Sequence, residues 1–249
     1  MAINVEISDG VGEVIIDAPP VNALDNAGWR EFAEKVQTVG LRDDVNCVVI
    51  RSEGRGFQAG VDVKELAENG DLIVDLNRGC YDSFAAVYDC PVPTISAVHG
   101  YCIGGGIGIA GSSDFIIASE DATFSLPEID RGALGAATHL MRMVGVQKAR
   151  RMLYTCEAIS AQELHRLGGC ESVVPKDRLR DEVMKIARAI ATKSPRALRL
   201  GKFALNGIET LDVKKSYRYE QGFTLELYTT KDSQEARDAF VEKRDAKYE

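Results

Sequence analysis

Two patterns of apolar positions divide the chain into an α/β part and a helical part. Residues 3–7 alternate between apolar and polar, Asp9-Gly10 predicts a tight turn, and residues 14–16 are apolar again, which is typical of a β-hairpin. Further along, helical spacing and short apolar runs predict helices over 26–41 and 72–88, and buried strands over 45–50, 94–98 and 115–119. Strands that alternate with helices favour an α/β body.

Helical patterns dominate beyond residue 136. Ser160 and Glu163 form a capping box, and Pro195 suits the first position of a helix. Only 171–174 is typical of a strand in this region. The expected helices cover residues 137–155, 160–167, 178–193, 195–206, 213–229 and 233–246. We therefore expect a helical C-terminal region that follows the α/β body without a linker.

Composition narrows the class of protein. The 249 residues include 30 Lys and Arg against 38 Asp and Glu, a formal net charge of −8, which argues against a nucleic-acid-binding protein. No apolar run could span a membrane and no export signal is recognisable, so we expect no membrane partner and a cytoplasmic location. The six cysteines and three histidines are scattered and no Cys-x-x-Cys occurs, so we expect reduced cysteines and no metal site.

Two glycine-containing turns follow predicted strands, at 54–62 and 104–111. The second contains Gly106-x-Gly108-x-x-Gly111, which has the form of a dinucleotide fingerprint but begins eight residues after the strand instead of in the immediate turn. Both turns lead towards predicted helices, whose first N–H groups are unpaired. Two such donors aimed at one oxygen would form an oxyanion hole. The alternative is that the glycines only permit tight turns and close packing.

Several short motifs occur in a fixed order along nearly the whole chain, from 20–24 to 240–244. They are Gly56-Phe57, Ala59-Gly60-Val61-Asp62, Ala97-Val98-x-Gly100-x-x-x-Gly104-Gly105-Gly106 and Leu126-Pro127-Glu128-Ile129. Together they resemble the crotonase (enoyl-CoA hydratase/isomerase) superfamily. The resemblance implies a ββα spiral core over 1–195 and a helical region over 196–249 that assembles homotrimers or hexamers.

The resemblance also implies an acyl-CoA thioester substrate and no separate cofactor, since CoA enters as part of the substrate. The backbone N–H groups of Val61 and Gly105 would hold the thioester oxygen. Asp62 has a second interpretation as a helix-capping residue. The residues implied in substrate binding are Ala59, Val61, Asp62, Val63, Lys64, Gly105, Phe240 and Lys243, the last two at the CoA of a neighbouring subunit.

Departures from the family pattern narrow the range of reactions that we expect. Hydratases of this family hold water between two glutamates, and the positions that match them are Gly108 and Glu128. Glu128 is the expected general acid/base, because its apolar segment favours a raised carboxyl pKa; the alternative is a surface carboxylate beside a proline turn. The loop that follows Glu128 also differs from the family pattern, so the acyl pocket should differ in shape. His139 and Tyr81 are candidates for this pocket, with purely structural roles as the alternative.

Segments 17–23, 77–80, 132–140 and 217–223 resemble a narrower branch of the family, the actinobacterial crotonases of steroid catabolism. That resemblance implies hydrolysis of a ring carbon–carbon bond in a bicyclic dioxo-indene-carboxyl-CoA. Glu128 would activate water, and Val61 and Gly105 would stabilise a thioester enolate. Three alternatives stay open: an enoyl-CoA isomerase or hydratase, a non-catalytic CoA-ester binding protein, and a nucleotide-dependent oxidoreductase that uses the glycine stretch.

Overall fold

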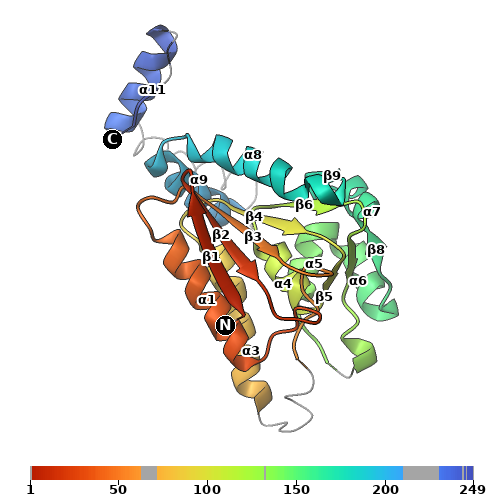
Figure 1. Ribbon diagram of the computed structural model, residues 1–249. Helices are drawn as coiled ribbons and strands as arrows, with labels where there is room; N and C mark the ends of the chain where they lie inside the picture. The colour runs from red at the N-terminus through yellow and green to blue at the C-terminus, as the bar shows by residue number, and fades with distance from the viewer. Residues whose placement is uncertain are drawn as a thin grey trace.

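The structure is a computed structural model that describes residues 2–62, 72–131, 133–209, 230–242, 244 and 246–248. Within those ranges the side chains of residues 131, 233, 236–238, 240 and 241 are outside the description. Figure 1 shows a sheet with helices on both of its faces and one helix, α11, that stands away from the body. The fold class is α/β, as the sequence predicts.

A six-stranded sheet lies at the centre, in the order β1-β2-β3-β4-β6-β9. The first two strands form an antiparallel hairpin around Asp9-Gly10, and the others continue parallel to β2. The hairpin and the three central strands are therefore confirmed, although β3 begins two residues later than predicted. The strands are β1 (Ile3–Ser8), β2 (Val11–Ile16), β3 (Cys47–Ser52), β4 (Thr94–Val98), β6 (Phe115–Ser119) and β9 (Ser172–Val174).

Both faces of this sheet are buried, which explains the continuous apolar runs of its central strands. On β3, Val48 and Ile50 join the apolar core that contains α1, whereas Cys47 and Val49 join the core that contains α8. Successive strand residues point to opposite faces, so a single run of apolar residues supplies two cores. The covering helices are α1 (Asn26–Gly40) and α3 (Ile73–Tyr88) on one face and α8 (Leu179–Ala191) on the other (Figure 1).

A second, three-stranded sheet is a feature that the sequence patterns do not predict. It consists of β5 (Tyr101–Ile103), β7 (Thr123–Ser125) and β8 (Ile159–Ser160). Strands of two or three residues are too short to show an alternating pattern. This sheet still fixes the path of the chain, because β5 leads into α4 (Gly105–Ser112) and β7 leads into residues 126–128 and the 3₁₀ turn η2 (Ile129–Arg131).

The helical region contains one break that the sequence analysis does not predict. The helix expected over 137–155 is two helices, α5 (Ala137–Val144) and α6 (Val146–Thr155), because Gly145 between them leaves the helical conformation. The capping box at α7 is confirmed in part, since the Ser160 hydroxyl accepts a hydrogen bond from the Glu163 N–H at 3.2 Å. The helix predicted over 213–229 lies outside the described residues. The other elements are α7 (Ala161–Arg166), η3 (Lys176–Arg178), α9 (Pro195–Ile208) and α11 (Lys231–Glu242), the last predicted over 233–246.

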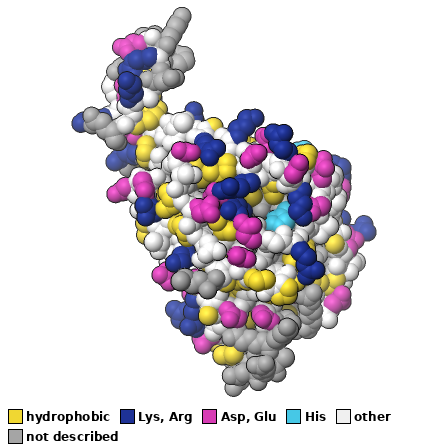
Figure 2. Space-filling view, viewed as in Figure 1, with side chains coloured by type: hydrophobic (Ala, Val, Ile, Leu, Met, Phe, Trp, Pro, Cys, Tyr) yellow, Lys and Arg dark blue, Asp and Glu magenta, His cyan; other side chains and the backbone are white. Residues whose placement is uncertain are grey.

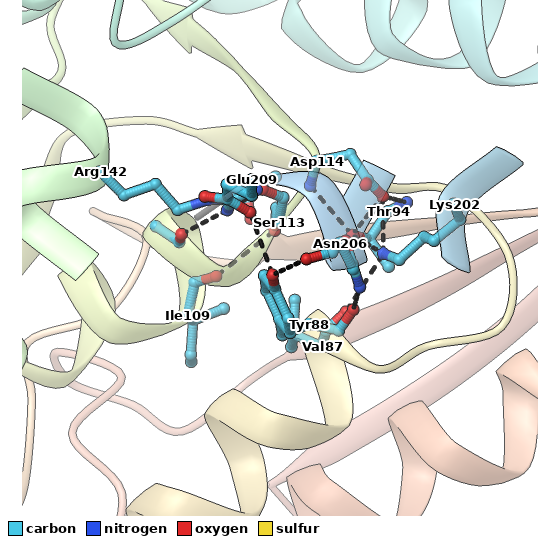
Figure 3. Close-up of polar contacts among 12 residues, drawn as sticks. Val87, Tyr88, Thr94, Ile109, Ser113, Asp114, Arg142, Lys202, Asn206 and Glu209 are labelled. Carbon is cyan, nitrogen blue, oxygen red and sulfur yellow. Dashed lines mark hydrogen bonds and ion pairs between the residues drawn. The ribbon is translucent and has the colours of Figure 1, made fainter. Parts of the chain in front are cut away.

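A network of charged side chains fixes α9 and α5 against the carboxyl end of α4 (Figure 3). The Lys202 ammonium of α9 is buried and lies 2.7 Å from the Asp114 carboxylate. Beside it, the Arg142 guanidinium of α5 donates to the carbonyls of Gly111 and Ser113, at 2.6 and 2.7 Å. A cation at the carboxyl end of a helix meets the negative end of the helix dipole. The network thus holds α4 at the end opposite its glycine-rich amino terminus.

Candidate active site

Three parallel segments end side by side, and the candidate site is formed where they end. β5 pairs in parallel with β7, with Cys102 opposite Phe124. On the other side of β5, Gln58 forms a parallel bridge with the same Cys102. The carboxyl ends of these segments therefore lie at one edge. The residues that follow them are Gly60-Val61, Gly104-Gly105 and Glu128.

Glycines bring these segment ends into contact. Gly60 has φ +90 and Gly104 has φ +56, both in the left-handed range that glycine tolerates. A Cβ atom built on Gly104 would lie 2.5 Å from Oε1 of Glu128 and 3.8 Å from the Cα of Gly60. One built on Gly60 would lie 3.5 Å from the amide nitrogen of Gly105. The structure therefore brings Glu128, Gly105 and the Gly60–Val61 peptide together.

Two peptide N–H groups in this cluster donate to no acceptor within the part of the chain that the structure describes. The Gly105 amide is the first of α4, so it is one of the helix-terminal donors without an intrahelical partner and lies at the positive end of the dipole. The Val61 amide follows the Gly60 carbonyl, which itself accepts from the Leu24 N–H at 3.1 Å. Two donors on separate stretches of backbone can stabilise one oxygen that gains negative charge.

The Glu128 side chain is half-buried behind β7. Phe124 and Leu126 before it are fully buried, and its own Oε2 is shielded from solvent. The Glu128 carbonyl accepts a hydrogen bond from the Ala133 N–H at 2.8 Å, which fixes the backbone at the start of η2. A carboxylate held in this way can take a proton from water or from carbon and return it.

The ring of Phe84 occupies the space that a side chain at position 108 would need. A Cβ atom built on Gly108 would lie 2.1 Å from Cζ of Phe84 and 2.4 Å from its Cε1. Phe84 comes from α3, which packs against α4. A glutamate at position 108 would therefore have no room beside the Phe84 ring. The glycine found here instead of the family's glutamate fits the position of that ring.

Phe84 is the middle one of three rings on the glycine face of α4. Its ring centroid lies 5.8 Å from that of Trp29 and 4.9 Å from that of His139, both in edge-to-face geometry. Trp29 lies against Gly105, and His139 lies against Gly111. Residues of α1, α3 and α5 thus match the three-residue spacing of these glycines, the first two with their rings and His139 with its Cβ atom and backbone. A Cβ atom built on Gly106 would lie 2.7 Å from the Gln58 carbonyl oxygen, so close packing accounts for all three glycines of the fingerprint pattern without a dinucleotide.

Replacing Gly108 by alanine should lower the free energy of unfolding by about 1–3 kcal/mol, because the new methyl group would overpack against Phe84. Urea unfolding of the purified variant measures this. In a Phe84→Ala background the same change should cost nothing further. Gly201→Ala is the matched control, since Gly201 lies in α9 with open space at its Cβ position and alanine should stabilise that helix by about 0.5–1 kcal/mol. Equal effects at the two glycines would contradict the packing argument.

His139 and Tyr81 differ in their placement. Burial, and then the positive charge of Arg142, lower the pKa of His139, so its imidazole is neutral near pH 7. Its Nδ1 is buried and has no hydrogen-bond partner among the described residues. His139 therefore lies beside α4 with Phe84. Tyr81, in contrast, is 70 % exposed on α3.

The other expected binding residues are only partly visible. Ala59 and Asp62 are half-buried, and the Asp62 N–H donates to the Leu24 carbonyl at 2.9 Å. Phe240 belongs to α11, which contacts α9 and stands away from the site in Figure 1; its side chain is not described. Val63, Lys64 and Lys243 lie outside the described residues.

Sequence reasoning missed three residues of this region: Gln58, Trp29 and Phe84. The two aromatic residues have the helical spacing of ordinary core positions, so nothing in the pattern connects them with α4. Gln58 carried a weak signal, since it is a long polar residue between Phe57 and Ala59-Gly60 in a turn.

Within the described ranges, no group of three or more His, Cys, Asp or Glu side chains could hold a metal ion. Over the same ranges, no helix has the length and apolar character needed to cross a membrane. Figure 2 shows Lys and Arg intermixed with Asp and Glu on one face, whereas nucleic-acid-binding surfaces concentrate positive charge.

Known proteins resemble this chain over its whole length. A family model for enoyl-CoA hydratase/isomerase proteins matches residues 6–249. The chain is 52% identical to the "(7aS)-7a-methyl-1,5-dioxo-2,3,5,6,7,7a-hexahydro-1H-indene-carboxyl-CoA hydrolase" of Rhodococcus jostii, over 94% of this chain and 92% of that protein. It is 49% identical to the protein of the same name from Mycobacterium tuberculosis, over 94% of this chain and 96% of that one.

Solved structures agree with this match. The enoyl-CoA hydratase of Bacillus anthracis superposes with a TM-score of 0.95 at 30% identity, covering 100% of this chain and 99% of that chain. That of Mycobacterium smegmatis gives a TM-score of 0.94 at 27% identity, over 99% and 98% of the two chains. The protein therefore belongs to the enoyl-CoA hydratase/isomerase, or crotonase, family.

Proposed function

We propose that this protein is an acyl-CoA enzyme that hydrolyses a ring carbon–carbon bond in a cyclic β-diketone-type CoA ester. The substrate we assign is the dioxo-hexahydro-indene-carboxyl-CoA in the name of the two relatives at 52% and 49% identity. The resemblance of the sequence connects this ester with steroid breakdown. One observation carries the proposal. Among the residues that the structure describes, the Glu128 carboxylate lies near two amides that donate to no acceptor, while Phe84 fills the place of a side chain at Gly108.

The reaction begins with Glu128 as a general base. Its carboxylate takes a proton from water, and the resulting hydroxide adds to a ring ketone. The bond then breaks between this ketone carbon and a ring carbon whose electron pair can conjugate with the thioester carbonyl, and the pair is delocalised onto the thioester as an enolate. Glu128 returns the proton to a carbon of this enolate. One water is consumed, one carboxylic acid is formed, and the CoA thioester remains.

The Val61 and Gly105 amides act on the enolate. Its oxygen gains negative charge only as the ring bond breaks, so donors held ready at that point lower the barrier without binding the ground state equally well. Each such donor typically contributes about 3 kcal/mol. Because these are backbone groups, the valine side chain at position 61 does not interfere with the role.

Two other activities remain as outcomes of the same test. A single carboxylate with the same two amides could also move the double bond of a 3-enoyl-CoA, which is isomerase chemistry. Without turnover, the site would serve only to bind CoA esters. Hydration needs a second carboxylate, and Phe84 blocks the position where it would stand.

Incubation with the dioxo-indene-carboxyl-CoA in H₂¹⁸O, followed by mass spectrometry, tests the proposal. The expected product retains CoA, is heavier by one water and carries the label in a new carboxyl group. A shifted double bond on a 3-enoyl-CoA, with no ring opening, would replace the proposal by isomerisation. Unchanged ester in both reactions would leave a binding protein.

A further inference from the structure

Gln58 holds both backbone polar groups of Gly60, which belong to two successive peptide groups. Its side chain is fully buried. Oε1 accepts a hydrogen bond from the Gly60 N–H at 2.7 Å, and Nε2 donates to the Gly60 carbonyl at 2.7 Å. Because the amide uses one acceptor and one donor on the same residue, these contacts fix the orientation of the Gly60 backbone as well as its position.

The Gly60 carbonyl and the Val61 N–H belong to one planar peptide group. In a trans peptide the C=O and the N–H point in opposite directions. The Gly60 carbonyl is held from one side by Nε2 of Gln58, at 2.7 Å, and by the Leu24 N–H, at 3.1 Å. The Val61 N–H must therefore point away from Gln58 and Leu24.

Gln58 also lies against the start of α4. Cβ atoms built on Gly105 and Gly106 would lie 3.5 and 3.2 Å from its Oε1, and the Gln58 carbonyl accepts from the Ile103 N–H at 2.9 Å. One buried side chain thus lies between the two strands of backbone that carry the Val61 and Gly105 amides. Movement of either stretch relative to the other would break a Gln58 contact.

We propose that Gln58 is a positioning residue that aims the Val61 N–H at the thioester oxygen. Its side chain is fully buried, and it acts through the Gly60–Val61 peptide. The inference rests on the proposed function, since it assumes that a CoA thioester binds at these amides. It goes beyond that function by assigning the orientation of one donor to a particular side chain.

The test measures the polarisation of a bound thioester carbonyl. The probe is cyclohexanecarboxyl-CoA labelled with ¹³C at the thioester carbon, which has no ring ketone and cannot be cleaved. Infrared difference spectra of the full-length enzyme report its C=O stretch, and titration of the same probe reports Kd. A hydrogen-bonded carbonyl absorbs at lower frequency than the free ester, so the frequency of the band reports the hydrogen bonds that the thioester oxygen accepts.

The main variant is Gln58→Met, which keeps the volume of the side chain and removes both hydrogen bonds. Gln58→Glu at mildly alkaline pH is the second, because an ionised carboxylate retains an acceptor for the Gly60 N–H but cannot donate to its carbonyl. Gln162→Leu is the matched control, since Gln162 is exposed and its amide donates to the Glu120 carbonyl in another part of the fold.

The wild type and the Gln162→Leu control should show a lowered C=O frequency. In Gln58→Met and Gln58→Glu the band should move back towards the free ester while Kd stays within about threefold. Their kcat for the ring ester should fall on the order of 10²-fold, the loss typical of one missing donor. This combination of a shifted band, a nearly unchanged Kd and a lower kcat is expected if the Gly60–Val61 peptide rotates while the binding site stays intact.

The outcomes separate the two proposals. A folded Gln58 variant with the wild-type band, or one that has lost the probe altogether, overturns the positioning role and leaves the proposed function intact. If the wild-type protein does not bind the probe, or binds it without a shift of the band, the CoA-ester site itself is wrong. If Gln58→Met does not fold, Gln58→Glu decides by the same band.

Discussion

Glu128→Gln should lower kcat for ring hydrolysis by about 10³-fold, while the affinity for the CoA ester changes by no more than about threefold. Glutamine keeps the size of the side chain but cannot take a proton from water at Oε1, the atom that lies against Gly104. The affinity should persist because backbone amides, and not Glu128, bind the thioester oxygen in the proposed site. Steady-state kinetics and titration with the uncleavable ester measure the two quantities.

Glu171→Gln is the control for this prediction. Glu171 is exposed and precedes β9, so the same change of charge there should leave kcat unchanged. Turnover of Glu128→Gln within tenfold of the wild type would remove Glu128 from the chemistry. Loss of binding together with turnover would instead indicate a structural role.

Gly104→Ala should lower kcat for hydrolysis by at least about 10²-fold and also lower stability. The new Cβ atom would lie 2.5 Å from Oε1 of Glu128, so the carboxylate or the backbone before α4 must move. A change of this size at a reacting group typically costs about 10²-fold in rate. The left-handed conformation at φ +56 adds roughly 1–2 kcal/mol of strain for any residue with a Cβ atom.

Gly168→Ala separates the strain from the clash. Gly168 has φ +80 but open space at its Cβ position, so alanine there should lower the free energy of unfolding by a similar strain and leave kcat unchanged. Thermal unfolding and kinetics of both variants give the comparison. An active Gly104→Ala enzyme would show that Glu128 does not work from its place beside Gly104.

The fold was predictable where a pattern repeats over enough residues. The β1–β2 hairpin, the apolar strands β3, β4 and β6 and the helices α1 and α3 follow from periods of 2 and 3.6. The second sheet was not, because β5, β7 and β8 are held by pairing between distant segments and have two or three residues each. The break at Gly145 was missed because the apolar spacing of α5 continues into α6.

The candidate site was predictable as a set of motifs but not as an arrangement. Sequence motifs indicated Glu128, Val61 and Gly105, and the structure brings the Glu128 carboxylate, Gly105 and the peptide before Val61 to one place. The sequence shows that position 108 lacks a glutamate, but it does not show that an aromatic ring occupies the space beside it. Phe84 reaches Gly108 from another helix, and no local pattern reports such a contact.

The most direct test of the account is a crystal structure of the Glu128→Gln variant with the dioxo-indene-carboxyl-CoA bound. The account predicts that the amide nitrogens of Val61 and Gly105 both lie about 3 Å from the thioester oxygen, with the side chain at position 128 facing the ring ketone. A thioester oxygen that touches neither nitrogen, or an ester bound elsewhere on the molecule, would contradict it.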